Sequence, residues 1–129
     1  MKQRILRFGL SRFPDATESS QVLKTLEEIN EHYNEPVYSE NWYMELADAY
    51  IAAVHCYERF GNVFCRFIVD QIEERADFAI LIDYIYRKMN INEERVWEGD
   101  KHIDNVSATK TVKRINYKTG ELTEETVNA

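Results

Sequence analysis

Two pairs of acidic residues at helical spacing constrain this chain more than any other feature of its sequence. The first pair is Glu28 and Glu31, and the second is Glu45 and Asp48. Residues three apart lie on the same side of a helix, so each pair directs two carboxylates toward one point. Two such helices side by side would gather four carboxylates, which repel one another unless a cation lies among them. The pattern therefore predicts neighbouring helices that hold a hard cation through oxygen ligands.

A simpler interpretation is that the acidic pairs form two solvated helix faces, since the chain has 23 Asp and Glu residues. At about 100° per residue, the carboxylates point away from the apolar stripe of their own helix, so a monomeric bundle would leave them in water. The metal interpretation thus requires packing on both sides of the second helix, by another helix or a second subunit. Ala49, Ala52 and His55 on its acidic side would permit this. His55 itself is either close to the site or a buried structural histidine.

Apolar periodicity predicts four helices with short connections, over residues 17–33, 41–59, 63–75 and 77–94. The expected core stripes, in that order, are Val22, Leu26, Ile29 and Tyr33; Leu46, Tyr50, Ala53, Val54 and Tyr57; Phe64, Phe67, Ile68 and Ile72; and Phe78, Leu81, Ile82, Ile85 and Met89. Four Gly and two Pro in 129 residues suit helices better than a turn-rich β fold. We therefore expect an all-α protein built as a four-helix bundle.

The segments around these helices are less regular. Residues 1–14 mix basic and aromatic side chains and predict a short strand or an irregular arm. Asp15 or Thr17 is the expected N-cap of the first long helix, and Gly61 with Asn62 is the expected stop of the second. Residues 98–112 are polar and resemble a linker, while 112–127 suggest a hairpin turning at Gly120. The expected division is a helical domain, 1–97, and a C-terminal tail, 98–129.

Composition excludes several classes of protein. A net charge of −7 does not favour nucleic acid or anionic membranes as partners. No apolar run approaches the ~18 residues of a membrane span, and the N-terminus lacks the apolar region of a signal peptide. Cys56 and Cys65 have no C-x-x-C spacing, so we expect them to be reduced core residues of a cytoplasmic protein.

The acidic pairs belong to a longer pattern. Glu27-Glu28-x-x-Glu31, a spacer and Glu45-x-x-Asp48 together resemble the EExxE…ExxD signature of the MazG-like, all-α nucleoside triphosphate pyrophosphohydrolases. A resemblance on this pattern implies a MazG-like helical bundle. It also implies that Glu28, Glu31, Glu45 and Asp48 hold Mg²⁺, and that Glu27 orients or deprotonates the attacking water.

A second block supports the same resemblance. Lys88-x-x-x-Asn92-x-x-Arg95, followed by Trp97, resembles the end of the last core helix in that family, in the form found in phage-type members such as dATP/dGTP pyrophosphohydrolases. The segment 12–17 is also similar, so the resemblance covers roughly 12–98. It implies that Lys88, Asn92 and Arg95 bind the triphosphate. Trp97 either stacks on the base or is a packing residue.

The resemblance implies hydrolysis of a nucleoside triphosphate between the α- and β-phosphates, which gives a nucleoside monophosphate and pyrophosphate. A purine deoxynucleotide is slightly favoured, and a homo-oligomer, dimer or tetramer, is expected. The alternative hypothesis is a helical interaction protein that keeps this fold without catalytic activity.

Overall fold

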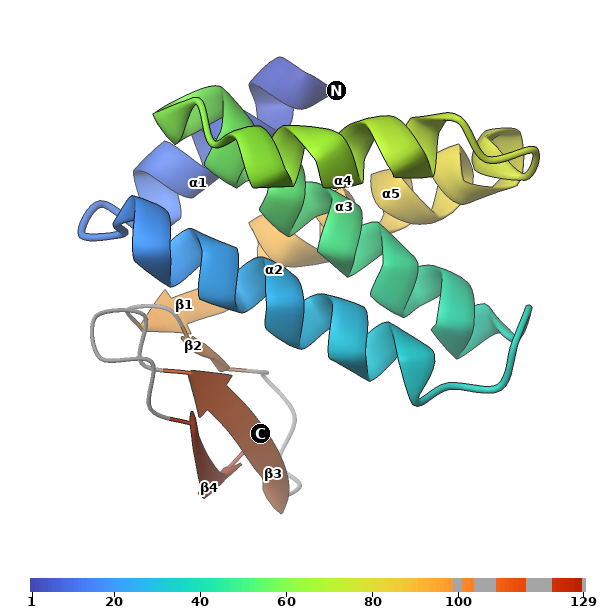
Figure 1. Cartoon of the computed structure of the whole chain (residues 1–129). Coiled ribbons are helices and arrows are strands. Elements are labelled where there is room, and N and C mark those ends of the chain that lie inside the picture. The colour runs from blue at the N-terminus through green and yellow to red at the C-terminus, as the bar shows by residue number, and fades with distance from the viewer. Residues whose placement is uncertain (99–100, 104–108, 116–121, 129) are drawn as a thin grey trace.

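Helix α3, Glu40–Phe60, is the element on which the fold is assembled. The computed structural model describes residues 1–98, 101–103, 109–115 and 122–128. In this part of the chain four other helices pack against α3 (Figure 1). They are α1 (Lys2–Arg12), α2 (Glu18–Tyr33), α4 (Val63–Glu73) and α5 (Phe78–Glu94). The expected helical class is confirmed for residues 1–95, with one helix more than predicted.

The ends of the long helices follow their local sequence. The Thr17 hydroxyl accepts a hydrogen bond from the backbone N–H of Ser20, whose hydroxyl accepts one in return, which makes Thr17 and not Asp15 the cap of α2. Helix α3 begins at the Ser39 cap. It ends at Gly61, which adopts the left-handed conformation with φ of 68°, as the sequence predicts.

Residues 2–12 form helix α1, so the expected strand or irregular arm is wrong. This helix crosses α3 at Gly9, where an added Cβ would overlap the imidazole ring of His55. The guanidinium of Arg59 donates hydrogen bonds to the carbonyls of Phe13 and Pro14, at 2.9 and 3.1 Å. The close approach at Gly9 and these bonds at the end of α1 fasten the N-terminal segment to α3.

Helix α2 is turned opposite to the expected orientation. Leu26 and Tyr33, predicted to be core residues, are 45% and 76% exposed. The residues of α2 that are buried are polar: Ser20, Gln21, Thr25 and His32. Because α2 meets α3 through this polar side, Leu26, Ile29 and Tyr33 form an outward apolar stripe in which Ile29 is half-buried, while Val22 packs against the core as predicted.

Helices α4 and α5 complete the core, which α3 dominates. Cys65, Val69 and Ile72 of α4 are buried, whereas the predicted core residues Phe64 and Phe67 are exposed. In α5, the side chains of Leu81, Ile85 and Met89 are buried as expected, and Ile82 lies at the exposed edge. Cys56 and Cys65 are buried free thiols, as predicted. Over the described residues, no helix is both long enough and apolar enough to cross a bilayer.

Short strands follow the helices. Strand β1 (Val96–Glu98) pairs antiparallel with β2 (Lys101–Ile103), so the segment expected to be a linker begins with paired strands. Strand β3 (Thr109–Ile115) pairs antiparallel with β4 (Leu122–Asn128), with Ile115 opposite Leu122. This pairing agrees with the predicted hairpin, while its turn at Gly120 lies outside the described residues. The division between 97 and 98 stays a prediction.

Candidate metal centre

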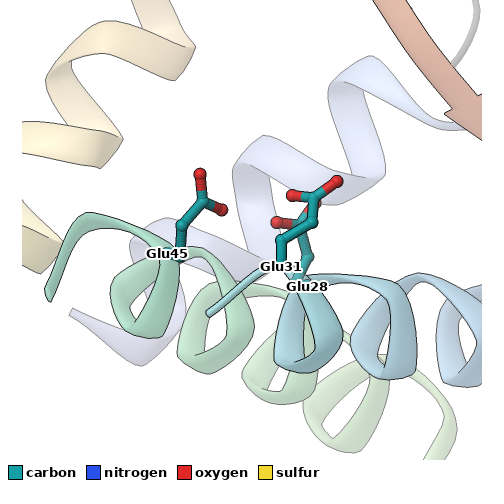
Figure 2. Close-up of side chains that lie close together, drawn as sticks. All are labelled: Glu28, Glu31 and Glu45. Atoms are coloured by element: carbon teal, nitrogen blue, oxygen red, sulfur yellow. The ribbon is translucent and has the colours of Figure 1, made fainter. Parts of the chain in front are cut away.

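Helices α2 and α3 lie side by side and bring the two acidic pairs together. Figure 2 shows that Glu28 and Glu31 project from α2, and Glu45 from α3, into the same space. One carboxylate oxygen of each residue lies within 4.8 Å of the other two. All three side chains are half-buried, so the expectation that a monomer leaves them in water is wrong. The rotation of α2 that exposes Leu26 explains the difference, because it turns Glu28 and Glu31 toward α3.

Glu45 has the environment that most favours a bound cation. Its Oε2 atom is buried and makes no hydrogen bond within the described residues. Burial, together with the neighbouring carboxylates of Asp48 and Glu31, raises the pKa of Glu45 to about 8, against the opposing charge of Lys88. A buried carboxylate oxygen without a partner is costly, and a divalent cation would satisfy it. The three converging carboxylates could therefore hold a cation through oxygen ligands.

Asp48, the fourth predicted ligand, lies beside the other three but has a partner of its own. Its Oδ2 is 2.9 Å from Nζ of Lys88 on α5, and the two side chains are only 20% and 12% exposed. Burial raises the pKa of the Asp48 carboxyl, and the Lys88 ammonium opposes that rise. The predicted metal and phosphate residues thus meet in one ion pair.

The remaining acidic residues differ in their surroundings. Burial raises the pKa of Glu28 well above its ordinary value, with Asp48 as the next cause. Glu27, the expected catalytic residue, is half-buried and lies one position earlier on α2, about 100° around the helix from Glu28. It adjoins the group of three converging carboxylates without belonging to it.

The predicted phosphate-binding residues stand at the end of α5. Asn92 is buried, and Arg95, the C-terminal cap of α5, is half-buried. Burial lowers the pKa of Arg95, while the charges of Asp48 and Glu28 act in the opposite direction. Arg95 is therefore electrostatically linked to both helices of the acidic centre. Trp97 belongs to β1, and its side chain lies outside the described residues.

Lys24 is a member of the centre that sequence reasoning missed. It lies on α2 one turn before Glu28, and its ammonium is 5.2 Å from the centre of the Phe13 ring. Its charge lowers the pKa of both Glu28 and Asp48. The spacing of four residues between Lys24 and Glu28 is a signal that could have identified it.

His55 is a structural residue and not a ligand of the centre. Its Nδ1 donates to Oε1 of Gln21 at 2.9 Å, and its Nε2 accepts from Arg59 at 3.3 Å. Burial, together with the charges of Arg59 and Lys24, lowers the pKa of His55 to about 4. The ring is therefore neutral near pH 7 and joins α2 to α3 through hydrogen bonds.

No protein-family model, curated protein or solved structure matches this chain. Helices α2, α3 and α5 supply the residues of the acidic centre. They define a helical protein with an acidic, cation-lined centre between α2, α3 and α5.

Proposed function

We propose that the protein is a MazG-like, Mg²⁺-dependent nucleoside triphosphate pyrophosphohydrolase. Its reaction is the cleavage of a (deoxy)nucleoside triphosphate between the α- and β-phosphates, giving the monophosphate and pyrophosphate. The observation that supports this best is the convergence of Glu28, Glu31 and Glu45, together with the unpartnered, buried Oε2 of Glu45. These are the features expected of a carboxylate site for a hard cation.

In this proposal the acidic residues divide into ligands and base. Glu28, Glu31 and Glu45 hold Mg²⁺, with Asp48 as the fourth ligand. When bound, Mg²⁺ supplies charge stabilisation to the phosphoryl group and lowers the pKa of a coordinated water. Glu27 orients or deprotonates the attacking water as a general base.

The cationic residues take the substrate. Lys88 and Arg95 stabilise the charge that spreads over the phosphate oxygens during transfer, and the amide of Asn92 fixes the triphosphate by hydrogen bonding. Trp97 offers an aromatic surface to the base. A purine deoxynucleotide is the favoured substrate on the phage-type resemblance.

Pyrophosphate release tests the proposal directly. The four common ribonucleoside and four deoxynucleoside triphosphates are supplied in turn, with Mg²⁺ or with EDTA. We expect Mg²⁺-dependent release from at least one of them, with the monophosphate as the other product. A folded protein that releases pyrophosphate from none of them in Mg²⁺ contradicts the proposal.

A homo-oligomer belongs to the same proposal. The outward apolar stripe of α2 places Leu26 and Tyr33 in solvent, and Phe64 and Phe67 are exposed on α4. Exposed apolar residues grouped on one helix are typical of an interface. These residues also favour the alternative function, a helical interaction protein without activity. That alternative predicts an oligomer or complex that forms normally while all eight nucleotides remain intact.

A further inference from the structure

We infer that Lys88 is a built-in counter-ion of the metal centre: it neutralises Asp48 until a divalent cation binds, and is then released to bind substrate phosphate. This inference rests on the proposed function, and it adds a competition between a side chain and the metal. It predicts that the same lysine weakens metal binding and strengthens nucleotide binding.

Asp48 is arranged differently from the other three acidic residues. Three of them converge with their oxygens within 4.8 Å, whereas Asp48 is joined to the Lys88 ammonium at 2.9 Å. The ammonium therefore neutralises the one predicted ligand that stands outside the converging group. The Lys88 ammonium already supplies a positive charge beside Asp48, at the place where the proposed metal ion would add a second positive charge.

Electrostatics makes the two cations competitors. Both would act on Asp48 at short range, in surroundings where the side chains are 12% and 20% exposed and water screens little. Each cation lowers the attraction of the site for the other, and such coupling is reciprocal. Binding of a divalent cation therefore weakens the pair between Lys88 and Asp48.

A second ion pair between α3 and α5 provides a comparison for the pair of Lys88 and Asp48. Arg87, the preceding residue of α5, reaches Glu40 of α3 at 3.1 Å, so both pairs link the same two helices. The Arg87 and Glu40 side chains are 55% and 71% exposed, and Glu40 is not one of the converging carboxylates. An exposed pair of this kind contributes little and has no competitor. Arg87 is therefore a matched control for Lys88.

Release of Lys88 gives it a second partner. A lysine ammonium is a compact charge on a flexible four-carbon stem, so it can leave Asp48 without movement of α5. The incoming triphosphate is the strongest anion in the proposed reaction and replaces the carboxylate as its partner. Arg95 also interacts electrostatically with Asp48 and Glu28.

The experiment is a calorimetric titration of Mg²⁺ into the nucleotide-free protein, its Lys88→Met variant and its Arg87→Gln variant. Loss of a nearby like charge should make Lys88→Met bind Mg²⁺ about tenfold more tightly. Arg87→Gln should bind as the unaltered protein does. In the hydrolysis assay, KM for the nucleotide should rise in Lys88→Met, although a larger fraction of this variant has Mg²⁺ bound.

The other possible results distinguish failure of this inference from failure of the proposed function. If Lys88→Met, folded by circular dichroism, binds Mg²⁺ as well as or less well than the unaltered protein, Lys88 is not a competitor and the inference is wrong while the metal centre stands. If the unaltered protein binds no Mg²⁺, the proposed function and the inference both fail. Should Lys88→Met not fold, Lys88→Gln, which can still donate to Asp48, is subject to the same criterion.

Discussion

Helices α2 and α3 both contribute carboxylates to one centre, but they bury opposite kinds of side chain. Helix α3 buries its apolar residues and is covered around most of its circumference. Helix α2 buries Gln21, Thr25 and His32 and leaves Leu26 and Tyr33 in solvent. Stability alone would favour the reverse orientation of α2, since burial of Leu26 is worth more than burial of Gln21.

The difference indicates what positions each helix. Helix α3 is placed by the core that it forms with α1, α4 and α5. Helix α2 packs with Glu28 and Glu31 facing Glu45, and polar contacts such as that between Gln21 and His55 join it to α3. We therefore expect substitutions in α3 to act on stability, and substitutions in the α2–α3 centre to act on function.

The largest effect is expected at Glu45. Because a catalytic metal supplies several kcal/mol of transition-state stabilisation, Glu45→Gln should lower turnover at least about a hundredfold. Metal-free stability should not fall, since the change removes a carboxylate that is costly to ionise in its buried position. Pyrophosphate release and denaturant unfolding measure the two quantities. Glu40→Gln, an exposed change on the same helix, is the control, and an equal loss of turnover there would contradict the assignment.

A pair of leucine substitutions tests whether apolar side chains contribute to stability in α3 but not in α2. Leu46→Ala in α3 should lower the free energy of unfolding by roughly 2–5 kcal/mol, because Leu46 is buried. Leu26→Ala in α2 should change it by less than about 0.5 kcal/mol at protein concentrations that favour the monomer. Urea unfolding measures both changes. Equal losses would mean that α2 contributes to the core as α3 does.

The acidic centre should make the metal-free protein less stable as pH rises from 4.5 to about 8. The folded-state pKa of Glu45 lies above its ordinary value of 4.5, at about 8, so the folded state retains a proton that the unfolded state has lost. Stability is then full below 4.5 and decreases as pH rises through about 8. Unfolding in EDTA and in Mg²⁺ over this range measures it. Mg²⁺ should reduce the dependence, and identical curves would exclude a metal at Glu45.

His55 should produce the opposite pH dependence. Its folded-state pKa of about 4 lies below the ordinary 6.5, so the unfolded state binds a proton first as pH falls. Stability is full above 6.5 and decreases toward pH 4, by roughly 3 kcal/mol at most. The difference in unfolding free energy between the unaltered protein and His55→Gln isolates this contribution. A difference that does not vary with pH would contradict a buried neutral histidine.

A smaller loss of stability than at Leu46 is expected at the crossing of α1 and α3. Alanine usually stabilises a helix relative to glycine, but Gly9→Ala should cost roughly 1–3 kcal/mol because its Cβ would overlap the His55 ring. Thermal unfolding measures the change, with the exposed Ser11→Ala on the same helix as the control. A stabilised Gly9→Ala variant would show that α1 does not approach α3 this closely.

These helices also show how far the sequence could be interpreted. Periodicity located α2 and α3 to within a few residues, and spacing predicted that Glu28 lies beside Glu31 and Glu45 beside Asp48, but not that the two pairs meet within one chain. It could not determine which side of α2 is buried, because that depends on what α3 presents to it. An apolar stripe with Leu26 and Tyr33 predicts that this side of α2 faces the core. The exception is a helix whose opposite side carries carboxylates that meet another carboxylate across the helix interface.

The N-terminal helix was missed for a related reason. Gly9 lowers helix propensity, yet it is the residue that lets α1 cross His55. Lys24 was missed because one lysine near an acidic motif resembles any surface charge, and only the fold places its ammonium against Phe13. Local sequence therefore predicted helices α2 to α5 and the two acidic pairs, while the contacts between elements decided the rest of the site.

The central claim is that α2 and α3 are oriented to bind a divalent cation. Calorimetric titration of Mg²⁺ into the unaltered protein and into Glu45→Gln, without nucleotide, tests it most directly. We predict saturable binding with release of protons in the unaltered protein, because the raised pKa of Glu45 keeps a proton on the centre until the ion arrives. In Glu45→Gln that binding should be lost or weakened strongly. Absence of binding in the unaltered protein, or equal binding in both, would contradict the account.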